Sequence, residues 1–467
     1  MYLCNYNNEN SNKLQAFQGM GIHPYTTTKK NGLIKGFSKL SKEEKILTVG
    51  ESFSDPAHFV KTLQSFWHED HNIQKRLDEF SENTLSNFYF PFGVAPNVII
   101  NGKAHIVPMV IEESSVVAAA SSSAKFWAER GGFHAEVIST TKIGQVHFIW
   151  KGDFEKLKSK ETGLRKFLIE RTDHITVNME ARGGGIKDIE LVDMSDQIED
   201  YYQLKAYFET VDSMGANFIN SCLEEFAELL NDFLEEDEEF SGAEKEVNVI
   251  MSILSNYTPE CLVKAWVECD LEDMTHCDDS LSPEEFIWKF EKAVKIAQAD
   301  VHRATTHNKG VFNGIDAVAL ATGNDFRAIE ACGHAYASRN GKYTSLTDIS
   351  LENGKFRYSL MLPLAIGTVG GLTSLHPMAK LSLEMLGNPK AEELMMIAAT
   401  IGLANNFGAI KSLITKGIQH GHMKMHLLNI MNHFEAGDEE KAEAVEYFKD
   451  KKVSFARVAE WLANRRK

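Results

Sequence analysis

A hairpin signal followed by a helix of small residues is the feature that most constrains the fold of this chain. Two short β-prone runs, residues 98–100 and 105–107, flank an Asn-Gly pair at 101–102, which is typical of a tight β-turn. Residues 116–127, rich in Ala and Ser, then predict a helix that ends at the Gly-Gly pair 131–132. Because small side chains let a helix approach its neighbours closely, we expect a mixed α+β fold with a tightly packed helix directly after the hairpin.

The rest of the chain predicts further elements of both kinds. Its 467 residues suggest two or three packed units, without an internal repeat or a low-complexity linker. Strands are expected over residues 146–150 and 189–192, with a helix over 154–170 between them. Further helical patterns cover residues 1–80, 211–240, 391–415 and the tail from 437. We interpret the acidic run 235–239 as a solvated helix end, and residues 283–345 as helix, a polar Gly- and Asn-rich stretch, and further helix.

Composition and charge exclude several classes of protein. Hydrophobic residues make up 43% of the chain and charged residues 25%, which is typical of a folded globular protein. The net charge of −17 disfavours a nucleic-acid partner. The six cysteines form no CxxC pair and lack zinc-ligand spacing, so we expect reduced thiols in a cytoplasmic protein. We identify no signal peptide and no run of about 20 apolar residues that would span a membrane.

Two segments place ionisable side chains where they could act on a carbonyl group. Glu112 and Glu113 follow an apolar strand and precede the small-residue helix. They either complement the helix dipole or include a carboxyl in an apolar cleft, with a raised pKa, that acts as a general acid. Lys309 lies among small polar residues in 303–314, between glycines that weaken a helix unless backbone must approach a ligand. It could stabilise an oxyanion, and a simple anion-binding loop is the alternative.

Three further segments carry weaker signals. Asp325 follows an apolar run and either delivers a carboxylate to a cleft or caps a helix. His422 belongs to the histidine-rich stretch 420–426, which lacks a metal-site pattern. A histidine that donates a proton fits this stretch better than a metal, and ordinary surface or core histidines are the alternative. Residues 212–217 open a helix whose free N–H groups could seat a pyrophosphate. No GxGxxG follows a strand, so a Rossmann fold is not supported.

Taken together, these segments resemble class II hydroxymethylglutaryl-CoA (HMG-CoA) reductases, the soluble microbial form of that family. The matching stretches occur in the family's order between about residues 50 and 430. They are residues 91–95 (PFGVA), 107–121 (VPMVIEESSVVAAAS), 212–217 (DSMGAN), 303–316 (RATTHNKGVFNGID), 321–328 (ATGNDFRA), 370–377 (GGLTSLHP) and 417–426 (GIQHGHMKMH). Seven matches in one order are too many to arise by chance.

The resemblance implies a set of catalytic roles. Glu113 matches the family's catalytic glutamate, and Lys309 matches the lysine that stabilises negative charge on the thioester or aldehyde oxygen. Asp325 matches the aspartate that orients both, and His422 matches the histidine that protonates the departing CoA thiolate. The positions that hold the HMG portion of the substrate match Ser115, Asn256, Arg303 and Asn313. The dinucleotide-binding signature contains Asp212, Met214, Gly215 and Asn217.

The resemblance also implies a reaction and an architecture. The enzyme would interconvert HMG-CoA with mevalonate and CoA by two hydride transfers from or to NAD(P)H, with no metal. The fold would be α+β: a large, mainly helical domain with a central helix and a short sheet, a small inserted ferredoxin-like cofactor domain, and a C-terminal helical flap. The implied boundaries are residues 1–140 and 256–412 for the large domain, 141–255 for the cofactor domain and 413–467 for the flap. A homodimer, and in some assemblies a higher oligomer, would complete the active site at the subunit interface.

Two departures from the family pattern bear on the cofactor. Ser213 stands where the signature usually has Ala. Thr176 falls where NADH-specific members carry an acidic residue for the ribose hydroxyls, although Asp173 is nearby. The basic residues of this region could instead meet a 2′-phosphate, and these are Arg171, His174 and Arg182. We therefore expect NADPH, with use of NADH left open.

Two alternatives remain. The chain could be a CoA-ester-binding oligomeric sensor with altered catalysis, although the four matched catalytic residues argue against this. Another acyl-CoA enzyme, such as a thiolase, would need a nucleophilic cysteine, and Cys332 has no suitable sequence setting.

Overall fold

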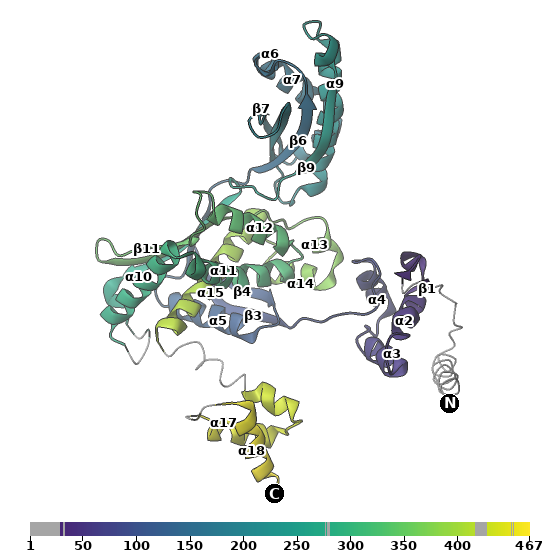
Figure 1. Cartoon of the computed structure of the whole chain (residues 1–467). Coiled ribbons are helices and arrows are strands. Elements are labelled where there is room, and N and C mark those ends of the chain that lie inside the picture. The colour runs from purple at the N-terminus through teal and green to yellow at the C-terminus, as the bar shows by residue number, and fades with distance from the viewer. Residues whose placement is uncertain are drawn as a thin grey trace. The chain divides into compact units, whose positions relative to one another are not determined.

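The chain forms two compact units, Met1–Pro91 and Phe92–Lys467, in a computed structural model (Figure 1). The structure describes residues 29–30, 33–275, 277, 281–415, 427–449, 451 and 453–467. The second unit carries every candidate site residue that the structure describes.

Residues 42–78 of the N-terminal unit are largely helical, as the sequence pattern predicts for this part of the chain. Its elements are β1 (Lys29–Lys30), β2 (Leu33–Ile34), the 3-10 turn η1 (Phe37–Lys39), α2 (Lys42–Gly50), α3 (Pro56–Ser65) and α4 (His71–Asp78). Ser41, Asp55 and Asp70 cap the three α-helices by accepting hydrogen bonds from backbone N–H groups of the first turn. Ile46 and Val60 lie in the small apolar core between α2 and α3.

The predicted hairpin and the helix after it are confirmed. Strands β3 (Phe92–Ile100) and β4 (Lys103–Val110) pair in antiparallel register. Asn101 and Gly102 both have positive φ, 50° and 82°, which is the conformation that a two-residue turn of this hand requires. Helix α5 (Ser114–Ala128) follows directly and packs on β3. The turn between β4 and α5 therefore fixes where residues 111–113 lie.

A second sheet and a set of helices complete the large domain, which we define as residues 92–141 and 255–414. The sheet has the antiparallel order β11-β12-β10-β5. Its strands are β5 (His134–Val137), β10 (Leu262–Asp270), β11 (Thr347–Ser350) and β12 (Lys355–Pro363). The remaining elements are η3 (Leu271–Asp273), α10 (Pro283–Ala299), α11 (Val301–Ala321), α12 (Phe326–Ala337), α13 (Leu372–Leu375), α14 (Pro377–Met385) and α15 (Ala391–Ile414).

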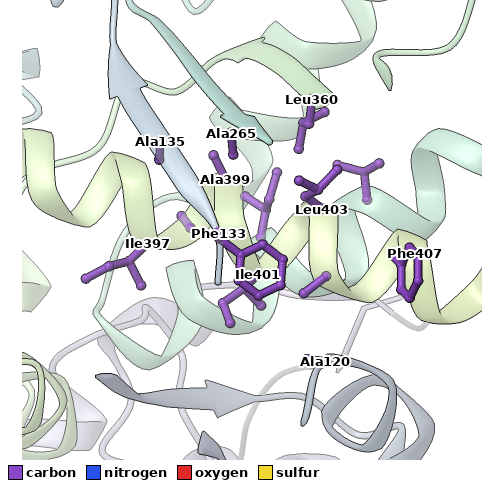
Figure 2. Close-up of a cluster of buried hydrophobic side chains, with 14 of the residues drawn as sticks. Ala120, Phe133, Ala135, Ala265, Leu360, Ile397, Ala399, Ile401, Leu403 and Phe407 are labelled. Carbon is purple, nitrogen blue, oxygen red and sulfur yellow. The ribbon is translucent and has the colours of Figure 1, made fainter. Parts of the chain in front are cut away.

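Helix α15 is the central helix of the large domain. Its Ile397, Ile401 and Phe407 are buried and pack in one apolar cluster with Ala120 of α5 and Leu360 of β12 (Figure 2). The helix is long and apolar enough to cross a membrane, but 78% of its apolar window is buried inside the protein. Burial on all sides explains its apolar composition, since a helix in a domain core has no solvated face.

Residues 303–314 are helical, which corrects the expectation of a polar stretch between helices. They belong to the uninterrupted helix α11. A Cβ on Gly314 would lie 2.6 Å from the carbonyl oxygen of Ile401 in α15, and a Cβ on Gly402 would lie 2.8 Å from Cγ1 of Ile315. The glycines thus allow α11 to pack closely on α15, and this tertiary packing outweighs their low helix propensity.

Residues 142–254, here called the small α+β domain, have a hydrophobic core of their own. Its elements are β6 (Lys142–Trp150), α6 (Phe154–Ser159), α7 (Glu161–Arg171), α8 (Asp173–Glu180), β7 (Gly185–Asp193), β8 (Tyr201–Glu209), α9 (Ala216–Glu236), η2 (Gly242–Lys245) and β9 (Val247–Leu254). The antiparallel sheet has the order β7-β8-β6-β9. Helix α9 runs along β6 and β9 (Figure 1). The chain order is that of a β-α-β-β-α-β unit.

Three details of this domain differ from the sequence expectation. The helix expected over 154–170 is broken at Lys160, which separates α6 from α7. The helix expected over 211–240 begins only at Ala216, because residues 211–215 form a loop. The acidic run is more than a solvated helix end: Asp237 lies 2.7 Å from Nζ of Lys160, and Glu236 lies 2.9 Å from the guanidinium of Arg171. These ion pairs join the end of α9 to the α6–α7 segment.

The tail from residue 437 is helical, as expected. Helices α17 (Asp438–Tyr447) and α18 (Phe455–Arg465) share a small apolar core that includes Phe448 and Leu462. Ion pairs of Arg465 with Glu443 and of Arg466 with Glu440 link the two helices. His422 and the rest of 417–426 lie outside the described residues.

Candidate active site

Glu113 stands at the N-terminus of α5, where the β3–β4 hairpin ends. Its backbone is extended, with φ −98° and ψ 109°, and its side chain does not cap the helix. One carboxylate oxygen, Oε1, instead accepts a hydrogen bond of 2.5 Å from the hydroxyl of Ser115. The side chain is 43% exposed, so the described residues do not enclose it in the expected apolar cleft. Glu112, beside it, is also exposed.

Lys309 projects from the middle of α11 towards Glu113. Its Nζ lies 3.8 Å from Oε2 of Glu113, and its side chain is 62% exposed. Helix α11 packs on β4 and α5, so the same contacts that build the core hold the two side chains together. An ammonium and a carboxylate on rigid elements, both open to solvent, can contact one substrate group from two sides.

Asp325 is the N-cap of α12, at the end of the loop that follows α11. It accepts hydrogen bonds from the backbone N–H groups of Arg327 and Ala328, and its carboxylate lies 2.9 Å from the Arg327 guanidinium. The Arg327 guanidinium and these N–H groups hold the pKa of Asp325 below its usual range. Within the described part of the chain, no hydrogen bond or ion pair joins Asp325 to Lys309 or Glu113.

Arg303 lies in the first turn of α11, upstream of Lys309 on the same helix. Its guanidinium is half-buried, and burial lowers its pKa. Among the described residues it has no acidic partner within 4.0 Å, so its charge is available to an anion. Asn313 lies one turn beyond Lys309 and is half-buried. Asn256 lies in the exposed loop between β9 and β10.

A buried polar network lies beside Arg303, and no sequence motif points to it. His307 is 1% exposed, and its Nε2 lies 2.7 Å from the Thr347 hydroxyl. Its carbonyl oxygen accepts a hydrogen bond from the Asn406 side chain, whose oxygen accepts one from the Tyr358 hydroxyl. Burial, assisted by the Arg303 charge, lowers the pKa of His307 to about 3, so the imidazole is neutral.

The loop 211–215, between β8 and α9 of the small α+β domain, contacts the large domain. The side chain of Asp212 accepts a hydrogen bond of 2.9 Å from the N–H of Ala391, and its carbonyl oxygen accepts one of 2.8 Å from the N–H of Thr368. A Cβ on Gly367 would lie 2.5 Å from the backbone nitrogen of Met214. These contacts involve the backbone and the Asp212 side chain, so they fix the path of the loop.

Gly215 is the N-cap of helix α9. It has φ 92°, and a Cβ there would lie 2.4 Å from Cγ2 of Thr210. As a glycine, Gly215 has no side chain that could cap the helix, and Asn217 in the first turn is exposed. The first N–H groups of α9 are therefore available to an anion, which fits the phosphates of a dinucleotide.

The side chains expected to contact the cofactor's ribose differ in the contacts they make within the protein. The hydroxyl of Thr176 is buried and directed to the carbonyl oxygen of Asp173. Arg171 pairs with Glu236, and His174 lies 3.9 Å from a carboxylate oxygen of Glu225. The side chain of Arg182 is exposed and donates to the carbonyl oxygen of Asn178. Of the three basic residues, Arg182 is the one without an acidic partner among the described residues.

The fold and the site define a class of protein: an α+β protein that places an acid–lysine pair in its helical domain and an uncapped helix N-terminus in its small α+β domain. Comparison with known families is more specific. The family model for hydroxymethylglutaryl-coenzyme A reductase matches residues 51–427. The 3-hydroxy-3-methylglutaryl-coenzyme A reductase of Archaeoglobus fulgidus is 36% identical over 404 residues, which cover 85% of this chain and 86% of that protein. A probable reductase of the same name from Borreliella burgdorferi is 31% identical over 85% of this chain and 88% of that protein.

Solved structures give the same result. The chain is similar to the class II reductase of Streptococcus pneumoniae bound to NADPH in open conformations, with a TM-score of 0.67, 35% identity, and coverage of 82% of this chain and 99% of that one. A second structure from Streptococcus pneumoniae has a TM-score of 0.68 and 34% identity over 92% of this chain and 99% of that one. The chain therefore belongs to the hydroxymethylglutaryl-coenzyme A reductase family, and it is an oxidoreductase of that family.

Proposed function

We propose that this protein interconverts HMG-CoA with mevalonate and CoA. In the reductive direction, HMG-CoA, two NAD(P)H and two protons give mevalonate, free CoA and two NAD(P)⁺. The bound nicotinamide supplies one hydride in each of the two steps. The observation that carries the proposal is the pairing of Glu113 and Lys309 at 3.8 Å, because it joins an acid and a fixed ammonium from two of the family's stretches.

The residue types suit the charge changes of this reaction. Each hydride addition builds negative charge on the substrate's carbonyl oxygen, which the ammonium of Lys309 would stabilise. Glu113 would donate the proton that the resulting alkoxide needs, and Ser115 would hold the Glu113 carboxyl in place. His422 would protonate the CoA thiolate and so prevent its return to the aldehyde.

Arg303 supports the binding of an acidic acyl group. HMG carries a free carboxylate, and a half-buried guanidinium that has no acidic partner among the described residues is suited to bind it. Asn313 and Asn256 would add neutral hydrogen bonds to the same acyl portion. Such a site discriminates against acyl groups without a carboxylate, because a buried charge would then stay unpaired.

The small α+β domain is proposed as the cofactor domain of ferredoxin-like type. The uncapped N-terminus of α9 would take the pyrophosphate, with Asp212, Met214 and Asn217 around it. We favour NADPH over NADH, because a related class II reductase binds NADPH and Arg182 lacks an acidic partner among the described residues. Thr176 is the least suited of the expected residues, since its hydroxyl is buried. Metal is not part of the proposal.

A homodimer is proposed to complete the site. An apolar stripe of exposed side chains follows α13 and α14 at a spacing of three or four residues: Leu372, Leu375, Met378, Leu381 and Met385. These helices lie against the loop before Asp325, since a Cβ on Gly323 would lie 3.1 Å from the backbone of Leu372. A partner covering the stripe would enclose Asp325 and favour its turning from Arg327 to Lys309. A cytoplasmic location is proposed because Cys222, Cys261, Cys269 and Cys332 are buried free thiols.

The proposal is tested by turnover. Purified protein with HMG-CoA should consume NADPH, measured by loss of its absorbance, and should release free CoA thiol. Two molecules of NADPH should disappear for each CoA released. Oxidation of mevalonate in the presence of CoA and NADP⁺ tests the reverse direction. Calorimetry could show HMG-CoA binding while neither NADPH nor NADH supports turnover in either direction. The protein would then be a CoA-ester-binding sensor instead of an active reductase.

A further inference from the structure

Lys142 is a buried lysine with an unusual partner. It is the first residue of β6 and is 4% exposed. Its Nζ donates a hydrogen bond of 2.7 Å to the hydroxyl of Thr210, and no carboxylate lies within 4.0 Å of it among the described residues. Burying an ammonium is costly unless its charge is balanced. In a chain of net charge −17, the absence of a balancing carboxylate at this position requires an explanation.

Thr210 connects this ammonium to the loop that begins α9. Its hydroxyl donates a hydrogen bond of 2.7 Å to the carbonyl oxygen of Ser213, and its own carbonyl oxygen accepts bonds from the N–H and the hydroxyl of Ser213. Gly215 packs against its methyl group, since a Cβ there would lie 2.4 Å from it. The side chain of Lys142 therefore supports the loop 211–215 through Thr210.

Two sources of positive charge adjoin the loop 211–215: the Lys142 ammonium and the N-terminus of α9. Lys142 is paired with Phe208 in the β6–β8 ladder, so its side chain lies on the inner face of the sheet, which α9 covers. The uncapped N-terminus of α9 carries a partial positive charge. Glu209, the carboxylate at the end of β8, is engaged by the Thr140 hydroxyl and the N–H of Val211. The Lys142 ammonium and the N-terminus of α9 both adjoin the loop 211–215, so their positive charge would favour an anion bound there.

We propose that Lys142 is a positioning residue of the dinucleotide site, which it serves by holding Thr210 and by adding positive charge behind the pyrophosphate position. This rests on the proposed function. The charge acts on the pyrophosphate that NADPH and NADH share, so Lys142 favours both dinucleotides equally. The structure offers a matched control at the same end of the sheet: exposed Lys187 donates a hydrogen bond of 2.8 Å to Thr141.

The test measures dissociation constants for NADPH, NADH and CoA in the full-length protein, by fluorescence or calorimetry, together with the inhibition constant of inorganic pyrophosphate. Lys142→Met should weaken both dinucleotides on the order of tenfold, as expected for loss of a charged partner. Pyrophosphate inhibition should weaken in parallel, and CoA affinity should not change. Lys142→Arg should restore part of the loss, and Lys187→Met should bind as the wild type does.

Two results would overturn the inference. One is a folded Lys142→Met protein with unchanged dinucleotide affinity. The other is an equal loss for CoA and for both dinucleotides, which would indicate general loosening of the structure. If Lys142→Met does not fold, Thr210→Val and Thr210→Ser decide, since only Val removes the hydroxyl and only Val should weaken both dinucleotides. Wild-type protein that binds neither dinucleotide would refute the proposed function itself, whereas normal wild-type binding with unaffected variants refutes only the role of Lys142.

Discussion

Replacing Lys309 with Met should remove catalysis and leave the fold intact. The lost partner is Glu113, 3.8 Å away, and Coulomb attraction at that distance is about 1 kcal/mol in water and about 4 kcal/mol at a protein surface. Because the two side chains are 62% and 43% exposed, solvent and side-chain entropy reduce the net contribution to below about 1 kcal/mol. The free energy of unfolding should therefore change little.

Turnover should respond very differently. An ammonium that stabilises a developing oxyanion contributes about 3–4 kcal/mol to the transition state, so kcat should fall by about 10²–10³. The assay is NADPH consumption with saturating HMG-CoA, alongside urea unfolding of the same preparations. Lys125→Met, an exposed lysine on α5, is the control for loss of charge. Retained turnover in Lys309→Met, or a loss of stability well above 1 kcal/mol, would refute the reasoning.

Three further predictions concern groups away from the acid–lysine pair. Burial and the neighbouring Glu330 raise the pKa of Asp316 to about 8. The folded state then keeps a proton that the unfolded state loses above pH about 4, so urea unfolding should show stability falling as pH rises from 4 to 8. Asp316→Asn should flatten this slope, and an unchanged slope would contradict the assignment. Gly314→Ala should destabilise the protein by about 1–3 kcal/mol, because its Cβ would lie 2.6 Å from the backbone of Ile401; an unchanged melting temperature would show that α11 can move. Cys332 should resist iodoacetamide in the native protein, since burial raises the pKa of its thiol. Labelling of Cys332 with loss of turnover would favour thiol chemistry.

The sequence predicted those elements whose signal is local. The Asn-Gly turn at 101–102 and the small-residue helix α5 are specified by neighbouring residues, and both are confirmed. Together they placed Glu113 at the start of a helix. Local signals could not predict that residues 303–314 are helical. The glycines that argue against a helix are needed for packing on α15, more than eighty residues away.

The parts of the candidate site that the sequence did not reveal depend on long-range contacts. The partner of Lys142 is Thr210, and only the pairing of β6 with β8 brings them together. The acidic run looked solvated because its partner Lys160 lies between α6 and α7, more than seventy residues earlier in the chain. The pairing of Asp325 with Arg327 involves two neighbours in the sequence, yet a motif match with the family points to Lys309 instead. A motif match names a residue type, whereas the partner depends on the surrounding structure.

The placement of Arg303 and Lys309 on one helix has a consequence for how substrate preference can change. Both charged side chains belong to α11, which packs closely on α15 at Gly314 and Gly402. Any shift of that helix moves both Arg303, which would bind the acyl carboxylate, and Lys309, which would stabilise the oxyanion. A change that repositions one of them therefore also displaces the other. Variants that accept new acyl chains should therefore arise in the loops around the site, and libraries directed at α11 or α15 should yield mostly inactive protein.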